Sequence, residues 1–123
     1  MNSDVMKVAN DRCPFLELFS VINRKWSMLV LASIRASGKV GYKGIENGLK
    51  GISPKSLTDT LSLLMLNGLI TKKKLGGIPP RVEYSLTPLG TELVELFEPI
   101  IIWAQSVTDH AECPILEFLS IKS

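Results

Sequence analysis

The sequence of 123 residues predicts a mainly helical α+β fold, and three observations carry that prediction. Two short helical segments joined by a glycine-containing turn are typical of a helix-turn-helix. A capping residue followed by proline marks two helix starts, at Ser53-Pro54 and at Thr87-Pro88. Between them, the alternation of apolar and polar residues over 81–86 predicts one strand of a β-hairpin. A hairpin that directly follows makes the unit winged, so we expect a single winged helix-turn-helix domain over 1–123.

The N-terminal part of the chain is expected to form a flexible segment and three helices. Residues 1–12 are polar and mixed, which indicates a flexible N-terminus. Pro14 suits the first position of a helix. A second helix over 26–36 is predicted to bury one stripe, formed by Trp26, Leu29, Val30 and Ile34. A shorter third helix over 42–49 then opens the helix-turn-helix.

The second helix of that motif has the clearest start in the chain. Ser53 can cap the free amides of the first turn, and Pro54 sits just inside it. Its apolar residues fall at helical spacing and predict one buried face, made by Leu57, Leu61, Leu64 and Met65. Asn67-Gly68 ends the helix. We therefore place the helix-turn-helix at 42–66.

Residues 69–86 are predicted to form the wing. Strands over 69–75 and 81–86 flank a Gly-Gly-Ile-Pro-Pro loop. In the second strand, Val82, Tyr84 and Leu86 should face the core while the alternate residues face water.

The C-terminal region, 88–122, is expected to form dimerisation helices. A long helix should carry one apolar side and a kink at Pro99; that side comprises Leu89, Leu93, Leu96, Phe97 and Ile100. A last short helix is predicted over 115–121. Because so much apolar surface exceeds what one small domain can cover, we expect a two-fold dimer held by the N-terminal and C-terminal helices.

The charge of the chain is concentrated in its middle. Residues 24–81 hold eleven basic and two acidic side chains, a net charge of +9, whereas the remaining residues sum to −7. A cluster of lysine and arginine attracts nucleic-acid phosphates through release of condensed counterions. Double-stranded DNA is therefore the predicted partner.

Eight residues are the candidate DNA-binding side chains. A helix of this type enters the major groove, while the hairpin lies along phosphates or reaches the minor groove. The candidates are Lys43, Ser53, Lys55, Ser56, Thr58, Lys72, Lys74 and Arg81. The competing interpretation is an ordinary solvated surface, because charged runs usually serve solubility.

Several functional classes are disfavoured by the composition. We expect no enzyme, because there is one histidine and neither a nucleophile motif nor a phosphate loop. No cofactor is expected, nor a metal site, because Cys13, His110 and Cys113 give three ligands where structural zinc needs four. No apolar run is long enough to span a membrane. Two cysteines suit a reducing compartment, so we expect a cytoplasmic protein.

The residues from about Cys13 to Trp103 resemble the HxlR-type winged-helix transcription regulators of prokaryotes, which are relatives of the MarR group. The motifs that carry the resemblance are Cys13-Pro14, Lys25-Trp26, Gly51-Ile52-Ser53, Asn67-Gly68-Leu69 and the run 79–87. Members often carry arginines where this chain has Glu46, Asn47, Thr60 and Ser62, and Asp59 stands in the recognition face. We therefore expect DNA affinity to depend mainly on the wing.

The resemblance implies a homodimer that binds a two-fold-related operator and regulates transcription, and it allows a small-molecule effector of unknown identity. In some members a cysteine at the position of Cys13 is a redox or electrophile sensor, so Cys13 is the candidate redox-sensing thiol. A packing role is the alternative for that side chain. Two other functions stay open: a winged-helix protein-interaction module without DNA binding, and a thiol-based redox-sensing regulator.

Overall fold

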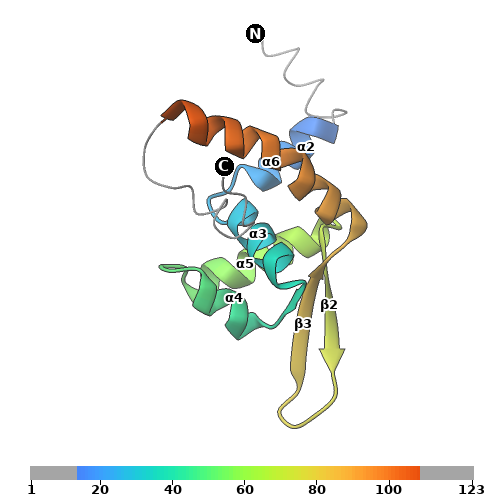
Figure 1. The fold of residues 1–123 in the computed structure, drawn as a ribbon. Helices are drawn as coiled ribbons and strands as arrows, with labels where there is room; N and C mark the ends of the chain where they lie inside the picture. Colours follow the sequence, from blue (N-terminus) through green and yellow to red (C-terminus); the bar gives the residue numbers. More distant parts are fainter. Residues whose placement is uncertain (1–13, 109–123) are drawn as a thin grey trace.

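The computed structural model describes residues 14–108 and confirms the mainly helical α+β fold (Figure 1). The described residues form five helices and a three-stranded sheet. In chain order these are α2 (Pro14–Ile22), α3 (Ser27–Ser37), β1 (Lys39–Val40), α4 (Tyr42–Gly48), α5 (Pro54–Leu66), β2 (Ile70–Leu75), β3 (Arg81–Leu86) and α6 (Pro88–Thr108). The predicted flexible segment, 1–12, and the predicted last helix, 115–121, lie outside the described residues.

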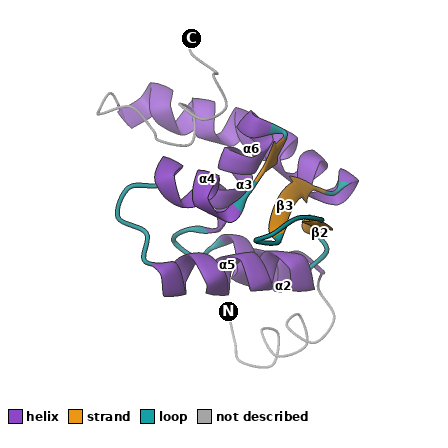
Figure 2. Cartoon of the chain, turned by 90° about the horizontal axis from the view of Figure 1, so that it is seen from below, coloured by secondary structure: helices purple, strands orange, loops and turns teal. Residues whose placement is uncertain are grey.

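The sheet has the order β1-β3-β2, and both pairs of strands are antiparallel. Strand β1 was not predicted, because two residues cannot display an alternating pattern. It pairs Lys39 with Ser85 and Val40 with Tyr84. Strand β3 is therefore central, and Figure 2 shows β2 and β3 side by side. The inner ends of these two strands lie against the body of the protein, whereas their outer ends project beyond the helices (Figure 1).

Helix α3 lies at the centre of the fold, where it contacts the four other described helices, β1 and β3. Because it is surrounded, seven of its residues are buried: Ser27, Met28, Val30, Leu31, Ala32, Ser33 and Ile34. The predicted single stripe was too narrow, and its members Trp26 and Leu29 are only partly buried. The buried Ser27 hydroxyl donates to the Val21 carbonyl oxygen at 2.7 Å, which satisfies it.

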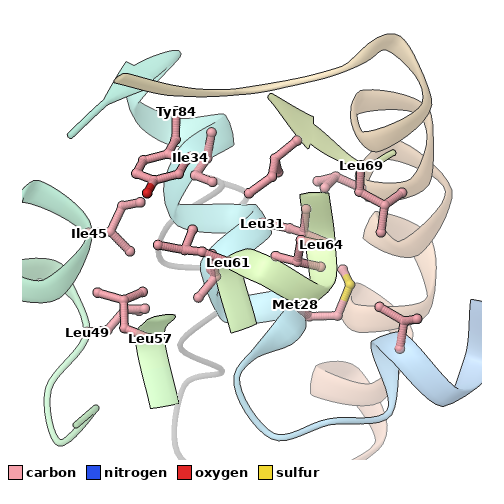
Figure 3. Close-up of a cluster of buried hydrophobic side chains, with 14 of the residues drawn as sticks. Met28, Leu31, Ile34, Ile45, Leu49, Leu57, Leu61, Leu64, Leu69 and Tyr84 are labelled. Atoms are coloured by element: carbon pink, nitrogen blue, oxygen red, sulfur yellow. The ribbon is translucent and has the colours of Figure 1, made fainter. Parts of the chain in front are cut away.

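The core joins α3 to both helices of the helix-turn-helix (Figure 3). Helix α4 contributes Ile45, and α5 contributes Leu57, Leu61 and Leu64, each at most 2% exposed. The predicted buried face of α5 is confirmed for these leucines, whereas Met65 is only partly buried. The opposite face of α5 is thereby fixed toward solvent.

The start of α6 is packed against the chain segment between α5 and β2. Thr87 caps the helix as predicted, because its Oγ1 accepts a hydrogen bond from the Gly90 amide at 3.0 Å. The same hydroxyl donates to the Gly68 carbonyl oxygen at 2.6 Å, and the Thr87 amide donates to that of Leu69 at 3.1 Å. A side chain at Gly90 would overlap the Leu69 carbonyl oxygen, so glycine permits this close approach.

The apolar face of α6 is broader than the stripe expected from its sequence, and the core covers only part of it. Leu93, Val94 and Ile101 are buried against the core. Leu89, Leu96 and Ile100, predicted to share the side of Leu93, are each more than half exposed. At 3.6 residues per turn the two sets lie next to each other on one broad apolar face, and only the part of that face that is turned toward α3 and β3 is covered. The helix continues through Pro99, where the kink stays a prediction. None of the described helices has the length and hydropathy to cross a bilayer.

Candidate nucleic-acid interface

One face of α5 is open to solvent and carries polar side chains. Burial of Leu57, Leu61 and Leu64 turns the opposite positions outward. Four of these are exposed at spacings i, i+3, i+4 and i+7: Lys55, Thr58, Asp59 and Ser62. An α-helix fits the major groove, and this face carries both donors and acceptors of the kind that pair with base edges there.

The start of α5 is held in place by local and long-range hydrogen bonds. The Ser53 hydroxyl caps the helix by accepting from the Ser56 amide at 3.0 Å. From the start of α4, the Tyr42 hydroxyl lies 3.2 Å from the Pro54 carbonyl oxygen, to which it donates, and 3.3 Å from Thr58 Oγ1. Tyr42 thus connects the start of α4 to the first turns of α5. It was absent from the sequence-based candidates, although its place at the first position of α4 was a usable signal.

Two of the candidate lysines are engaged in ion pairs on their own helices. Lys55 Nζ lies 2.9 Å from Asp59 Oδ2, four residues further along α5. Lys43 Nζ lies 3.2 Å from Glu46 Oε1 on α4. Both pairs involve exposed lysines, and exposed pairs of this kind contribute little to stability. Each lysine can therefore exchange its partner for another anion at small cost.

The register of the wing decides which of its cations share a face. Lys72 lies opposite Tyr84 and Lys74 opposite Val82, so both lysines share the face on which Tyr84 is buried. Lys73 lies opposite Glu83 on the other face. All three lysines are exposed.

Arg81 begins β3 opposite Leu75, near the outer end of the wing. Among the described residues, no ion pair involves the side chains of Lys72, Lys74 or Arg81. These three cations are therefore available to an external anion.

Two hollows flank the helix-turn-helix. One of about 560 Å³ lies between the wing and the start of α4, and its cationic lining residues are Lys39, Lys43 and Arg81, with Glu83 as the acid. The other, of about 230 Å³, lies between the corner 24–26 and the first turns of α5. Both are lined by positive side chains, which suits the sugar-phosphate backbone on either side of a bound groove.

The corner between α2 and α3 adds cations that were not among the eight candidates. Arg24 and Lys25 line the smaller hollow together with Ser56, Asp59 and Thr60 of α5. Lys25 Nζ lies 5.0 Å from the centre of the Trp26 ring, within the range of a cation–π contact that orients the ammonium. Only the tertiary fold shows that this corner adjoins α5.

Tyr84 is the titratable side chain whose pKa shift the described structure resolves. Burial, and secondarily the nearby Tyr42, raises the pKa of Tyr84 above its ordinary value of 10.0, which keeps that phenol neutral. The described part of the chain holds no cluster of three histidine, cysteine or acidic side chains that could hold a metal. Cys13, His110 and Cys113 lie outside the described residues.

Comparison with known proteins identifies the family. Residues 21–112 match a family model described as HxlR-like helix-turn-helix. The chain belongs to the HxlR-like helix-turn-helix family. An uncharacterized HTH-type transcriptional regulator of Escherichia coli, YtfH, is 30% identical over 95 residues, or 77% of this chain and 75% of YtfH. The HTH-type transcriptional regulator YodB of Bacillus subtilis is 31% identical over 106 residues, or 85% of this chain and 94% of YodB.

Solved structures of this kind also resemble the chain. The reduced form of YodB matches with a TM-score of 0.70 and 28% identity, covering 82% of this chain and 99% of YodB. The redox regulator HypR in its reduced form matches with a TM-score of 0.71 and 27% identity, covering 78% of this chain and 94% of HypR. These matches agree with the winged helix-turn-helix arrangement described above.

In this HxlR-like chain, the eight candidate residues form two groups. Lys43, Ser53, Lys55, Ser56 and Thr58 lie in or next to the helix-turn-helix, where each is already engaged in a hydrogen bond or ion pair. The second group, Lys72, Lys74 and Arg81, lies on the wing. Contact of either group with DNA is a proposal.

Proposed function

We propose that this HxlR-like chain regulates transcription by binding double-stranded DNA, with α5 in the major groove and the wing on the adjoining backbone. The observation that supports this most is the exposed polar face of α5 beside three wing cations that have no ion-pair partner in the described structure. Phosphate contacts would position the protein, and the α5 face would read base edges.

We further propose that the protein acts as a homodimer through α2 and α6, on a two-fold-related operator. Five apolar residues of α6 form an exposed stripe with spacings of seven, four, three and four residues: Leu89, Leu96, Ile100, Trp103 and Val107. Such spacing keeps the stripe on one side of a helix that packs against another helix. Helices α2 and α6 lie at the end of the molecule away from the wing tip, which leaves the DNA-facing end open (Figure 1).

Selection of bound fragments from random and genomic DNA, followed by binding across a salt series, tests this function. We expect enrichment of one two-fold motif, and an affinity whose logarithm falls linearly with the logarithm of salt concentration by about 0.9 per phosphate contact. Binding that is weak and insensitive to salt would reject DNA binding. That outcome would favour the alternative, a winged-helix module for protein interactions.

A thiol-based redox-sensing regulator is the second candidate function. It is supported by the likeness to HypR, described as a redox regulator, and to YodB, one structure of which is of the diamide-treated protein. Cys13 is the thiol we propose as the sensor. Peroxide or diamide should then change the DNA affinity of the wild type but not of Cys13→Ser. Equal response of both proteins would reject this role.

A further inference from the structure

An acidic side chain lies in the middle of the face that α5 would present to DNA. Asp59 is flanked by Lys55 one turn before it and Ser62 three residues after it, and all three are exposed. A carboxylate at this position repels phosphates and so lowers affinity for DNA of any sequence. Its presence in a helix that otherwise carries neutral hydroxyls and one lysine therefore calls for a compensating interaction.

We propose that Asp59 and Lys55 together read one G·C base pair in each half-site. Asp59 accepts a hydrogen bond from the N4 amino group of cytosine, and Lys55 donates to O6 and N7 of guanine. This inference rests on the proposed entry of α5 into the major groove.

The two side chains are already placed as a matched donor and acceptor. Lys55 Nζ and Asp59 Oδ2 lie 2.9 Å apart, and the side chains are 85% and 64% exposed. Because the residues are four apart, both project from the same face of α5. The pair therefore presents an ammonium and a carboxylate side by side to whatever occupies the groove. Since the pair is so exposed, it can open for the bases at little cost.

The chemistry of the base edges selects G·C. In the major groove a G·C pair offers two neighbouring acceptors on guanine and a donor on cytosine, which complement a lysine and an aspartate. An A·T pair offers the adenine N6 donor but lacks the paired O6 and N7 acceptors that the lysine uses. A carboxylate has only acceptors, so it cannot pair with guanine O6 or thymine O4.

Nearby cations offset the repulsion between Asp59 and the DNA backbone. Besides Lys55, the side chains of Arg24 and Lys25 line the hollow that Asp59 also lines. One positive side chain therefore pairs with Asp59 and two more line the same hollow, so the net charge of this group of residues is positive and attractive to phosphate. Asp59 can act as a base reader without abolishing binding.

The test is fragment selection and quantitative binding with the full chain and two matched variants. Asp59→Asn keeps the shape but replaces a pure acceptor with an amide, which favours adenine. Glu95→Gln makes the same change of charge on an exposed residue of α6, remote in sequence from α5. Circular dichroism verifies that both variants are folded.

We expect the wild type and Glu95→Gln to select the same two-fold motif, with one G·C position per half-site that Asp59→Asn no longer requires. At that position, replacing G·C by A·T should weaken wild-type binding roughly 5- to 150-fold, but Asp59→Asn binding much less. If Asp59→Asn selects the unchanged motif and binds all DNA more tightly, Asp59 only repels phosphate and the inference is rejected. If the wild type selects no motif, the proposed function itself fails.

Discussion

Replacing Leu96 by alanine should weaken the proposed dimer without unfolding the protomer. Leu96 is 64% exposed in the described structure, in the apolar stripe of α6. Fully burying a leucine contributes about 1.5–3 kcal/mol, so burying the part still exposed contributes about 1–2 kcal/mol in each protomer. A two-fold interface contains the residue twice. The wild-type contribution is therefore about 2–4 kcal/mol.

Alanine keeps one of the four side-chain carbons, so the variant should lose about 1.5–3 kcal/mol of association free energy. The dimer dissociation constant should rise roughly 10- to 150-fold. Sedimentation equilibrium over a range of concentrations measures this change. Ile78→Ala is the matched control, because Ile78 is 103% exposed in the wing loop and lies outside α6. A monomeric wild type at micromolar concentration, or equal effects of the two substitutions, would refute the reasoning.

Three further predictions concern the wing, the core and the start of α6. Arg81→Ala should weaken binding to all DNA alike and lower the salt slope by about one phosphate contact, whereas Lys55→Ala should cost about 1–3 kcal/mol on the selected site and less on random DNA. Titrations of both variants on both DNAs across a salt series measure this difference. Equal losses on the two DNAs for Lys55→Ala would make Lys55 a backbone contact. Because the pKa of Tyr84 is raised in the folded state, the contribution of this phenol to the free energy of unfolding should be complete below pH 10.0 and should decrease as the pH rises above it. Urea denaturation should therefore show that Tyr84→Phe loses less stability than the wild type at alkaline pH. Identical pH profiles of the two proteins would contradict this. Gly90→Ala should lower the free energy of unfolding by about 1–3 kcal/mol, because the new methyl group would overlap the Leu69 carbonyl oxygen. An unchanged midpoint of urea denaturation would show that the backbone can shift here without a cost in stability.

Much of the fold could be predicted because its signals are local. The Ser53 cap and the Thr87 cap each act within one helical turn, and both are present as expected. Gly68 has a φ of 72°, the conformation that ends a helix and favours glycine. The alternation over 81–86 gave the bounds of β3. In each case the responsible residues are neighbours in sequence, so no knowledge of distant contacts was needed.

The candidate site was predicted less completely, because its geometry depends on residues far apart in sequence. The contact of Tyr42 with the start of α5 spans twelve residues, and the corner at Arg24 meets α5 across more than thirty. Neither contact has a signature in local periodicity. The Lys55–Asp59 pair, by contrast, has the spacing of a helical ion pair and was visible in the sequence, although its partner role was not inferred.

The sequence by itself determined where α5, β3 and α6 begin, and that positive charge is concentrated in residues 24–81. Caps, turns and periodicity act over a few residues, so they need only the local chain. Only the tertiary structure decided which part of the apolar face of α6 is buried, and that Lys72 and Lys74 share the face of Tyr84. The physical reason is that burial and strand register depend on which distant elements pack together. A broad apolar face does not by itself indicate which part of it the core will cover.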